Sequence, residues 1–249
     1  KEVENLEITL HQHALTITDS LDDQIHISYH PSISANHDLV TNQNDKTLSL
    51  TDKKLSKSPF LSSGIGGILH IASSYSSRFD EVILQLPKGR SLKGINISAN
   101  RRQTTIINAS LENATLNTNG YLLRIEGSRI KNSKLTTPNI VNIFDTDLTD
   151  SQLESTEKHF HAENIKVYGK VELSSKNALS IMLTQKESQE INLDLSSHHG
   201  PIYQLSRDES QRHPNELSNP YKTEKTDAKG QLIAKADDYI SLETTANRP

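Results

Sequence analysis

The sequence predicts an all-β protein built as a β-solenoid, a stack of short parallel β-coils with about 19 residues per coil. Three observations predict this fold: a repeat of nearly fixed period over about residues 91–195, two strand-like patches in each period, and a composition rich in small polar residues. Ser, Thr and Asn account for 69 of the 249 residues, whereas hydrophobic residues make up 33% and aromatic residues 4%. Thin stacked coils with a large polar surface suit this composition better than a wide globular core.

The N-terminal third is predicted to form a strand-rich cap. Apolar and polar residues alternate there with a period of two, which places one face of each strand on a core and the other in water. Pro87 ends the last of these strands because proline cannot donate to a β-ladder. The alternating apolar positions are Leu6, Ile8 and Leu10; Leu15 and Ile17; Ile25, Ile27 and Tyr29; Leu48 and Leu50; and Val82, Leu84 and Leu86.

A glycine-rich segment, residues 64–67, interrupts this cap. No Lys-Ser or Lys-Thr pair and no helical pattern follows it, so it does not match a phosphate-binding loop. We interpret the segment as a flexible loop and name Phe60, Leu61 and Ile65 as candidate contact residues.

The repeat region supplies the main signal for the stack. The first apolar positions of successive units are separated by 19, 19, 18, 20 and 20 residues. One thin coil cannot bury its apolar side chains alone, whereas coils stacked at about 4.8 Å place equivalent side chains above one another. We therefore expect the first four of these positions to form one column. The six first positions are Leu92, Leu111, Ile130, Leu148, Tyr168 and Ser188, and the second strand patches are Ile106–Ile107, Leu122–Ile125, Ile140–Ile143, His159–His161 and Leu179–Leu183.

A meander of antiparallel hairpins of about nine residues each is the alternative, because it would also give regular spacing. The solenoid is favoured because two-residue hairpins prefer Asn-Gly or Asp-Gly turns, and only Asn119–Gly120 fits in the repeat. We assign residues 1–205 to one β-strand-repeat domain and residues 206–249 to an irregular C-terminal cap or tail. Within that segment, Leu232–Ile233 and Tyr239–Leu242 are candidates for two last strands.

Charge and composition exclude several classes of function. The net charge of −4 and the absence of a basic stripe argue against nucleic-acid binding, and the absence of cysteine excludes disulfides and thiolate sites. No run of about 18 apolar residues occurs, so we expect any membrane tether to lie outside these 249 residues, which begin at Lys1 rather than Met.

The segment 79–89, Phe-Asp-Glu-Val-Ile-Leu-Gln-Leu-Pro-Lys-Gly, together with the repeats after Ser91, resembles the bacterial "putative adhesin" family of β-strand-repeat domains of unknown function. The resemblance covers roughly Val3 to Leu205. The corner glycines of that family are often replaced here by Asn, which also tolerates the left-handed conformation. The resemblance implies an extracytoplasmic domain, at the cell surface or membrane-anchored, without known catalytic residues or cofactors.

Histidine is the first candidate for site chemistry, because there are 11. His11 and His13, and likewise His159 and His161, would share one face of a strand, but zinc normally needs three or four ligands, so we predict no metal site. In the second pair, either the register slips so that Phe160 points inward or this coil is locally open.

Acidic residues are the second candidate. Asp145, Asp147, Asp150 and Glu154 miss the EF-hand spacing and lack its glycine, so we interpret them as a solvated corner. A Gly-x-Ser-x-Gly nucleophile elbow is absent, and we predict no catalytic residues.

Three hypotheses for function follow. The favoured one is a non-catalytic bacterial surface or envelope module that binds an unidentified protein or glycan through stacked Asn, Thr and Ser rows, without nucleic acid as a partner. The alternatives are a carbohydrate-active enzyme on a β-helix, which needs two acids about 5–9 Å apart in a groove, and a spacer or sensor domain of a membrane-tethered stress protein.

Overall fold

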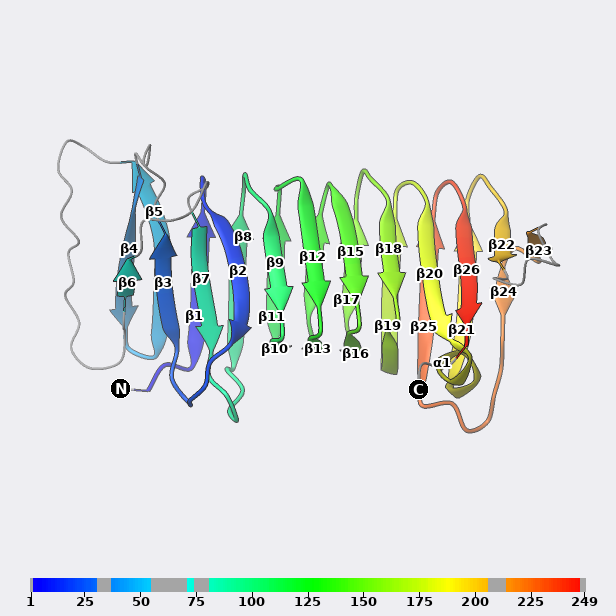
Figure 1. The fold of residues 1–249 in the computed structure, drawn as a ribbon, viewed down its shortest axis with the longest axis horizontal. Coiled ribbons are helices and arrows are strands. Elements are labelled where there is room, and N and C mark those ends of the chain that lie inside the picture. The colour runs from blue at the N-terminus through cyan, green and yellow to red at the C-terminus, as the bar shows by residue number, and fades with distance from the viewer. Residues whose placement is uncertain (1, 31–36, 55–70, 74–80, 206–213, 247–249) are drawn as a thin grey trace.

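A computed structural model describes residues 2–30, 37–54, 71–73, 81–205 and 214–246. The chain forms one elongated stack of β-layers in which neighbouring strands of the repeat are parallel (Figure 1). The predicted β-solenoid is therefore confirmed, and the antiparallel meander is wrong for the repeat region. One short helix, α1 (Gln185–Glu190), lies among the described residues.

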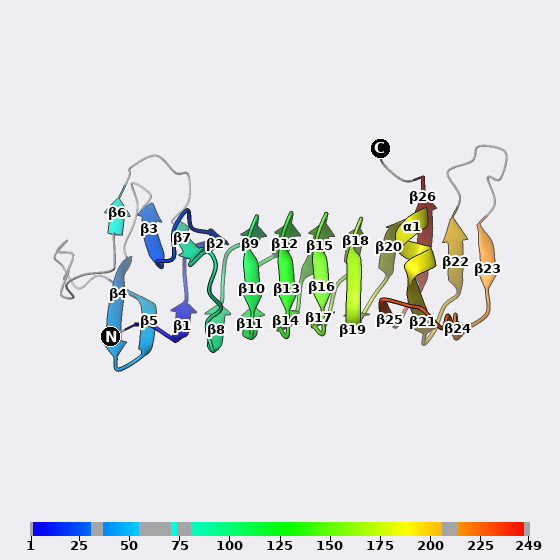
Figure 2. The ribbon, with the colours of Figure 1, turned by 90° about the horizontal axis from the view of Figure 1, so that it is seen from below.

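Each coil of the repeat contributes a strand to each of three faces, which we call A, B and C. Figure 2 shows face C along the middle of the stack, with α1 beyond β19. Face A consists of β4 (His37–Asn44), β5 (Thr47–Lys54), β1 (Asn5–Leu10), β8 (Gly94–Ala99), β11 (Ala114–Thr118), β14 (Lys134–Thr137), β17 (Gln152–Ser155), β19 (Lys166–Ser175), β25 (Gly230–Ala236), β21 (Ile191–Ser197) and β24 (Tyr221–Lys222).

Face B consists of β6 (Ile71–Ser73), β3 (His26–His30), β7 (Glu81–Leu86), β2 (Ala14–Asp19), β9 (Thr104–Ile107), β12 (Leu122–Glu126), β15 (Ile140–Phe144), β18 (Phe160–Glu163), β20 (Leu179–Thr184), β26 (Ile240–Thr245), β22 (Ile202–Leu205) and β23 (Asn215–Leu217). Face C consists of β10 (Ser110–Glu112), β13 (Arg129–Lys131), β16 (Asp147–Thr149) and the first residues of β19.

The expected aliphatic columns form the interior. On face C, Leu111 pairs with Ile130 and Ile130 with Leu148, all at most 1% exposed. Leu92 is also buried, and it lines the same cavity as Leu111 at the start of this column. Side chains in register therefore form a narrow apolar interior, and the burial of their surface stabilises the stack.

Two members of the predicted repeat are wrong. Val167, rather than Tyr168, pairs with Leu148 and is buried, whereas Tyr168 is 37% exposed. The reason is an extra corner residue: Val171 follows Val167 by four positions, whereas equivalent positions of the preceding coil are three apart. Ser188 belongs to α1 and not to a column.

The corners bend through residues with left-handed backbone conformation, as expected from the Asn substitutions. These residues form two columns, one between faces B and C and one between faces C and A. The first column is Asn108, Gly127, Asp145 and Asn164, and the second is Asn113, Asn132, Asp150 and Gly169, all with φ between 46° and 60°.

Buried hydroxyl groups line the inner side of these corners. The Ser133 hydroxyl accepts a hydrogen bond from the Ala114 amide at 3.0 Å and donates to the Lys131 carbonyl at 2.7 Å. The Ser151 hydroxyl repeats this arrangement one coil further, accepting from the Ser133 amide at 3.1 Å. Part of the high serine content is therefore structural, because these hydroxyls satisfy backbone groups that the bends remove from the ladders.

Both ends of the stack are interleaved. Strand β1 lies between β5 and β8, and β2 lies between β7 and β9, so the first strands of the sequence are not the outermost layer. At the other end, β25 lies between β19 and β21, and β26 lies between β20 and β22. The two suggested last strands are thus confirmed, and this part of the segment expected to be irregular is a full layer of the stack.

The open question about His161 is answered by the register of β18. Phe160 pairs with Val141 and is 1% exposed, whereas His161 pairs with Asn142 and is half-buried on the outer side. The register therefore slips by one residue, and Phe160 fills the interior.

Candidate interaction faces

The outer side of face A carries two straight rows of polar side chains. Successive residues in each row are direct strand partners, so they follow one another at about 4.8 Å. The first row is Ser49, Glu7, Asn96, Thr115, Lys134, Gln152, Glu172, Ile233 and Asp194, and the second is Thr51, Thr9, Ser98, Asn117, Thr136, Glu154, Ser174, Lys235 and Ser196. Ile233 is the single apolar side chain in the two rows.

This surface is built for hydrogen bonding rather than for reaction chemistry. Hydroxyl and amide groups both donate and accept, and most positions of the second row carry one of these groups. The strands beneath are paired on both sides, which holds the rows in fixed geometry. Asn96, Thr115 and Asn117 at the centre of the surface are exposed, so a partner can reach them without rearrangement of the fold.

Face B has a different character. Its outer side includes half-buried Leu122, Ile140 and Phe144 among polar residues. The Arg124 guanidinium lies 5.4 Å from the centre of the Phe144 ring, and the His161 ring lies 5.6 Å from it. Stacking and cation–π contacts therefore occupy these groups with one another, which leaves face A as the more regular hydrogen-bonding surface.

The first His-x-His pair is tied to a buried carboxylate. The Asp52 side chain accepts hydrogen bonds from the backbone amides of His11 and Gln12, both at 2.8 Å. Its two oxygens also lie 2.9 Å from His11 Nδ1 and 2.7 Å from His13 Nδ1. His13 Nε2 lies 3.1 Å from the Tyr29 hydroxyl, so this carboxylate joins the turn after β1 to β5.

Burial by itself would raise the pKa of Asp52. The hydrogen bonds from His13 and from the His11 and Gln12 amides outweigh it and hold the pKa of this carboxyl well below its usual range. The two imidazoles point at separate oxygens of one carboxylate, so the network ties strands together. No group of three or more His, Cys, Asp or Glu side chains in the described residues is arranged to hold a metal ion.

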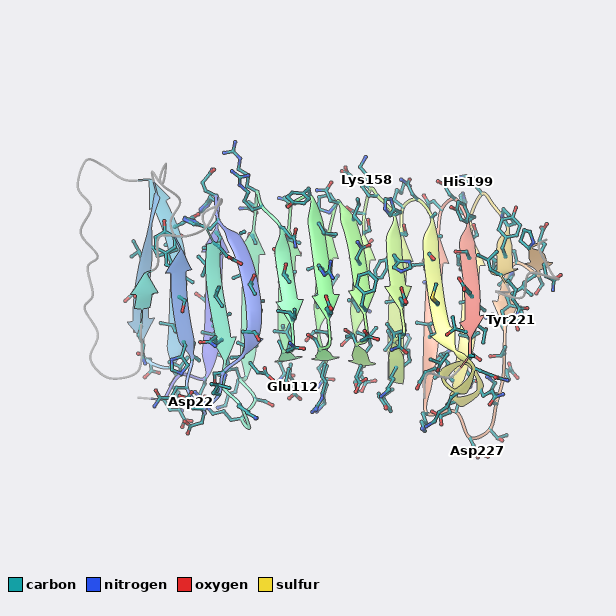
Figure 3. All side chains as sticks on the ribbon, in the orientation of Figure 1. Asp22, Glu112, Lys158, His199, Tyr221 and Asp227 are labelled. Atoms are coloured by element: carbon teal, nitrogen blue, oxygen red, sulfur yellow. The ribbon has the colours of Figure 1, made fainter. Side chains whose placement is uncertain are left out.

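The other two histidine pairs lie elsewhere in the stack. His159 is exposed and directly precedes β18, and His161 Nε2 lies 3.5 Å from a Glu163 oxygen. The His198 and His199 rings pack edge to face with centres 4.1 Å apart, near the turn between β21 and β22. Figure 3 shows His199 at the upper edge of the stack, on the side of Lys158.

Of the four acidic residues expected at a solvated corner, Asp145 and Asp150 lie at corners, whereas Glu154 lies on β17 in the second row of face A. Asp145 and Asp150 adopt left-handed conformation at the two corners of one coil, and Asp147 lies on β16 between them. Asp145 accepts a hydrogen bond from the Asn164 side chain of the next coil. The bends of the chain fix the positions of these corner residues. Asp147 Oδ1 lies 4.0 Å from Lys166 Nζ.

Two carboxylates in a cavity at the end of face C test the alternative that this domain is a carbohydrate-active enzyme. Glu112 and Asp19 both line a cavity of about 510 Å³ at the end of face C. Lys131, 2.8 Å from Glu112, lowers the pKa of Glu112, with a further contribution from the Ser91 hydroxyl. A general acid for glycoside hydrolysis needs a raised pKa, so this arrangement does not favour that chemistry.

The candidate contact residues Phe60, Leu61 and Ile65 lie outside the described residues, and their role stays a prediction. Sequence reasoning missed Asp52, although a signal was present. Asp52 is the next residue after Leu48 and Leu50 in the period-two alternation of β5, so the pattern predicts that its side chain points inward.

Family comparison agrees with this architecture. The profile of the Toastrack DUF4097 family, a domain of unknown function, matches residues 3–243. The chain belongs to this family. The match covers the interleaved strands at both ends, so the Toastrack domain includes β25 and β26 and does not stop at Leu205. The resemblance to β-strand-repeat domains of unknown function is thereby confirmed.

A solved structure similar to this Toastrack domain is that of a "putative cell adhesion protein" from Clostridium sporogenes. The two share 14% sequence identity with a TM-score of 0.30, over 98% of this chain and 94% of the other. A search of curated proteins found no match. Within the described part of the Toastrack chain, no helix has the length and apolar character needed to cross a membrane.

Proposed function

We propose that this Toastrack domain is a non-catalytic binding module of the bacterial cell surface or envelope, and that face A is its binding surface. The observation that carries the proposal is the pair of polar rows, in which 17 of 18 strand-partner positions hold polar or charged side chains. Such rows offer donors and acceptors at a constant spacing, which suits the hydroxyl groups of a glycan or the polar surface of a protein.

Two features support this proposal over the alternatives. The rows run over seven neighbouring strands, from β5 to β19, before the first apolar position at Ile233 on β25. The acid at the cavity of face C has a lowered pKa, unlike a general acid. The Toastrack family is a domain of unknown function, so the location at the cell surface or envelope is itself part of the proposal.

Three assays test the proposed binding: co-sedimentation with purified bacterial cell walls, binding to immobilised host matrix proteins, and flotation with vesicles. The face A variant is Asn96→Arg, Thr115→Arg and Asn117→Arg combined, because all three side chains are exposed. A matched control places three arginines on face B through Thr105→Arg, Asn142→Arg and Ser180→Arg. Both variants add the same charge to the outer side of one face, over β8 and β11 on face A and over β9, β15 and β20 on face B.

We expect wild type and the face B control to bind one of these targets and the face A variant to lose at least about tenfold in affinity, about 1.4 kcal/mol. No binding by wild type to any target would remove support for a binding module. Equal loss in both variants would show that face A is not the surface. Release of sugars from a cell-wall polysaccharide by the wild type would instead establish the enzyme alternative.

A further inference from the structure

Face C ends abruptly on the side of the N-terminal layers. Strand β10 pairs with β13 along one edge, and no strand among the described residues pairs with its other edge. The next layer contributes only the segment 87–93 at this level, which contains no strand. At the opposite end of face C, by contrast, α1 follows β19 (Figure 2).

The backbone of β10 points hydrogen-bonding groups at this open side. The Ala109 carbonyl accepts a hydrogen bond from the Arg129 amide, and the Asn113 amide donates to the Lys131 carbonyl. The backbone groups of the odd-numbered residues therefore face β13. The groups of Ser110 and Glu112 therefore face the other way. The Ser110 amide donates to Asp19 Oδ1 at 2.7 Å, whereas the Glu112 amide has no hydrogen bond to the described part of the chain.

A cavity of about 510 Å³ lies at this edge, between β10 and the segment 87–93. Hydrogen bonds tie that segment to other layers: the Lys88 amide donates to the Asp22 carbonyl at 2.7 Å, and Arg90 Nη1 donates to the Val3 carbonyl at 2.9 Å. Side chains link it to the β10 side: the Ser91 hydroxyl donates to the Glu112 carboxylate, and the Asn113 side chain donates to the Leu92 carbonyl at 3.2 Å. Leu92 and Leu111 provide apolar lining. In Figure 3, Asp22 and Glu112 lie at the same lower edge of the stack.

The charges around the cavity favour an acidic occupant. Both lining carboxylates are engaged, Asp19 with Ser110 and Glu112 with Lys131. Lys88 and Arg129 also line the cavity, and neither forms an ion pair or side-chain hydrogen bond with any described residue. Two uncompensated cations therefore flank an open strand edge.

We propose that an extended acidic peptide segment of a partner protein docks here as one further strand of face C beside β10. Because the Ser110 amide already donates to Asp19, the peptide backbone would pair with the Ser110 carbonyl and the Glu112 amide, as in strand addition to an exposed sheet edge. A central apolar residue would pack against Leu92 and Leu111, which line the cavity, and acidic residues on either side would meet Lys88 and Arg129. This inference does not depend on binding at face A.

The probe is a synthetic peptide, Asp-Thr-Asp-Leu-Thr-Asp-Ser, which is residues 145–151 of this chain and contains β16. It is acidic, and it already forms a face C strand with a central leucine. A second peptide with proline in place of leucine keeps the charge but removes a backbone donor. Titration of isotope-labelled protein, followed by amide chemical shifts, reports both the affinity and the location.

We expect the leucine peptide to shift the amide of Glu112 and its neighbours but not that of Thr136 on face A. The proline peptide should bind at least about fivefold more weakly, about 1 kcal/mol. Lys88→Glu should weaken the leucine peptide by a similar factor, whereas Lys158→Glu, at an exposed lysine on the opposite edge of the stack, serves as the matched control and should leave affinity unchanged.

Four outcomes would overturn the proposal. The first is no shift at about 1 mM peptide, which would mean binding weaker than about 4 kcal/mol. The second is equal binding of the proline peptide, which indicates adsorption by charge alone. The third is an equal effect of the two lysine variants, and the fourth is displacement by inorganic phosphate at constant ionic strength, which indicates a simple anion site. Loss of cell-surface binding in the face A variant alone leaves this result unaffected, so the two proposals fail separately.

Discussion

The carboxylate of Asp150 occupies the space beside the α-carbon of Gly169 in the next coil. A β-carbon on Gly169 would lie 2.1 Å from Asp150 Oδ1, and the backbone of Gly169 has a φ of +60°. The Lys170 amide, one residue further along, donates to the same oxygen at 3.0 Å. One corner side chain thus fixes the bend of the following coil.

Gly169→Ala should destabilise the domain by about 1–3 kcal/mol, because it adds both a clash and left-handed strain. Urea unfolding followed by circular dichroism measures the change. Asn132→Gly, at the same kind of corner with φ of 47°, is the control and should stay within about 0.5 kcal/mol of wild type. Combining Gly169→Ala with Asp150→Gly should recover part of the loss, and no recovery would contradict the contact.

Leu135→Ala should cost about 2–5 kcal/mol. Leu135 is fully buried in the face A column, paired with Leu116 and Leu153 on the neighbouring strands. Leu21→Ala removes the same atoms from a side chain that is 97% exposed and should have no measurable effect. Similar losses for both variants in thermal unfolding would argue against a stacked interior.

Ser133→Ala should cost about 1–3 kcal/mol, because it leaves the buried Ala114 amide without its acceptor. Ser174→Ala removes the same hydroxyl from the outer row of face A and should change stability by less than about 0.5 kcal/mol. The free energy of unfolding in urea distinguishes them. If the two variants behave alike, the corner hydroxyls are not structural.

Asp52→Asn should destabilise the N-terminal layers in a pH-dependent way. The folded pKa of Asp52 is lowered from the ordinary 3.8, so the folded state binds fewer protons, and the stabilisation is complete above that value and is lost as pH falls below it. The difference in unfolding free energy between wild type and variant should therefore be largest near pH 6 and shrink towards pH 2.5. Glu7→Gln, on exposed face A, controls for net charge, and a difference independent of pH would contradict this role.

Much of the stack was predictable because its determinants are local. Inward positions such as Leu116, Leu123 and Leu135 alternate with polar ones, and the spacing of 18–20 residues fixes which strands meet. Corner asparagines such as Asn108 and Asn113 mark the bends through their left-handed conformation. The sequence of a single coil determines these features, and they repeat in the next coil.

The rest depends on one local change in coil length and on contacts between distant segments. The spacing predicts Tyr168 as an inward residue, but one added corner residue shifts the phase of this coil and turns Val167 inward instead. The insertion of β25 between β19 and β21 reverses the order expected from the sequence, and no local pattern encodes it. Asp52 meets His11 and His13 across about 40 positions of the chain, so its role appears only when β1 and β5 are adjacent.

The interleaved ends change how this stack can come apart. In an ordinary solenoid the outermost coil is also the end of the chain, so the molecule can fray one turn at a time. Here β25 and β26 can leave only by breaking ladders on both sides at once, while the layer outside them is held by continuous chain on either side. The terminal layers should therefore unfold together rather than one at a time, which protects both ends of this elongated molecule from local unfolding.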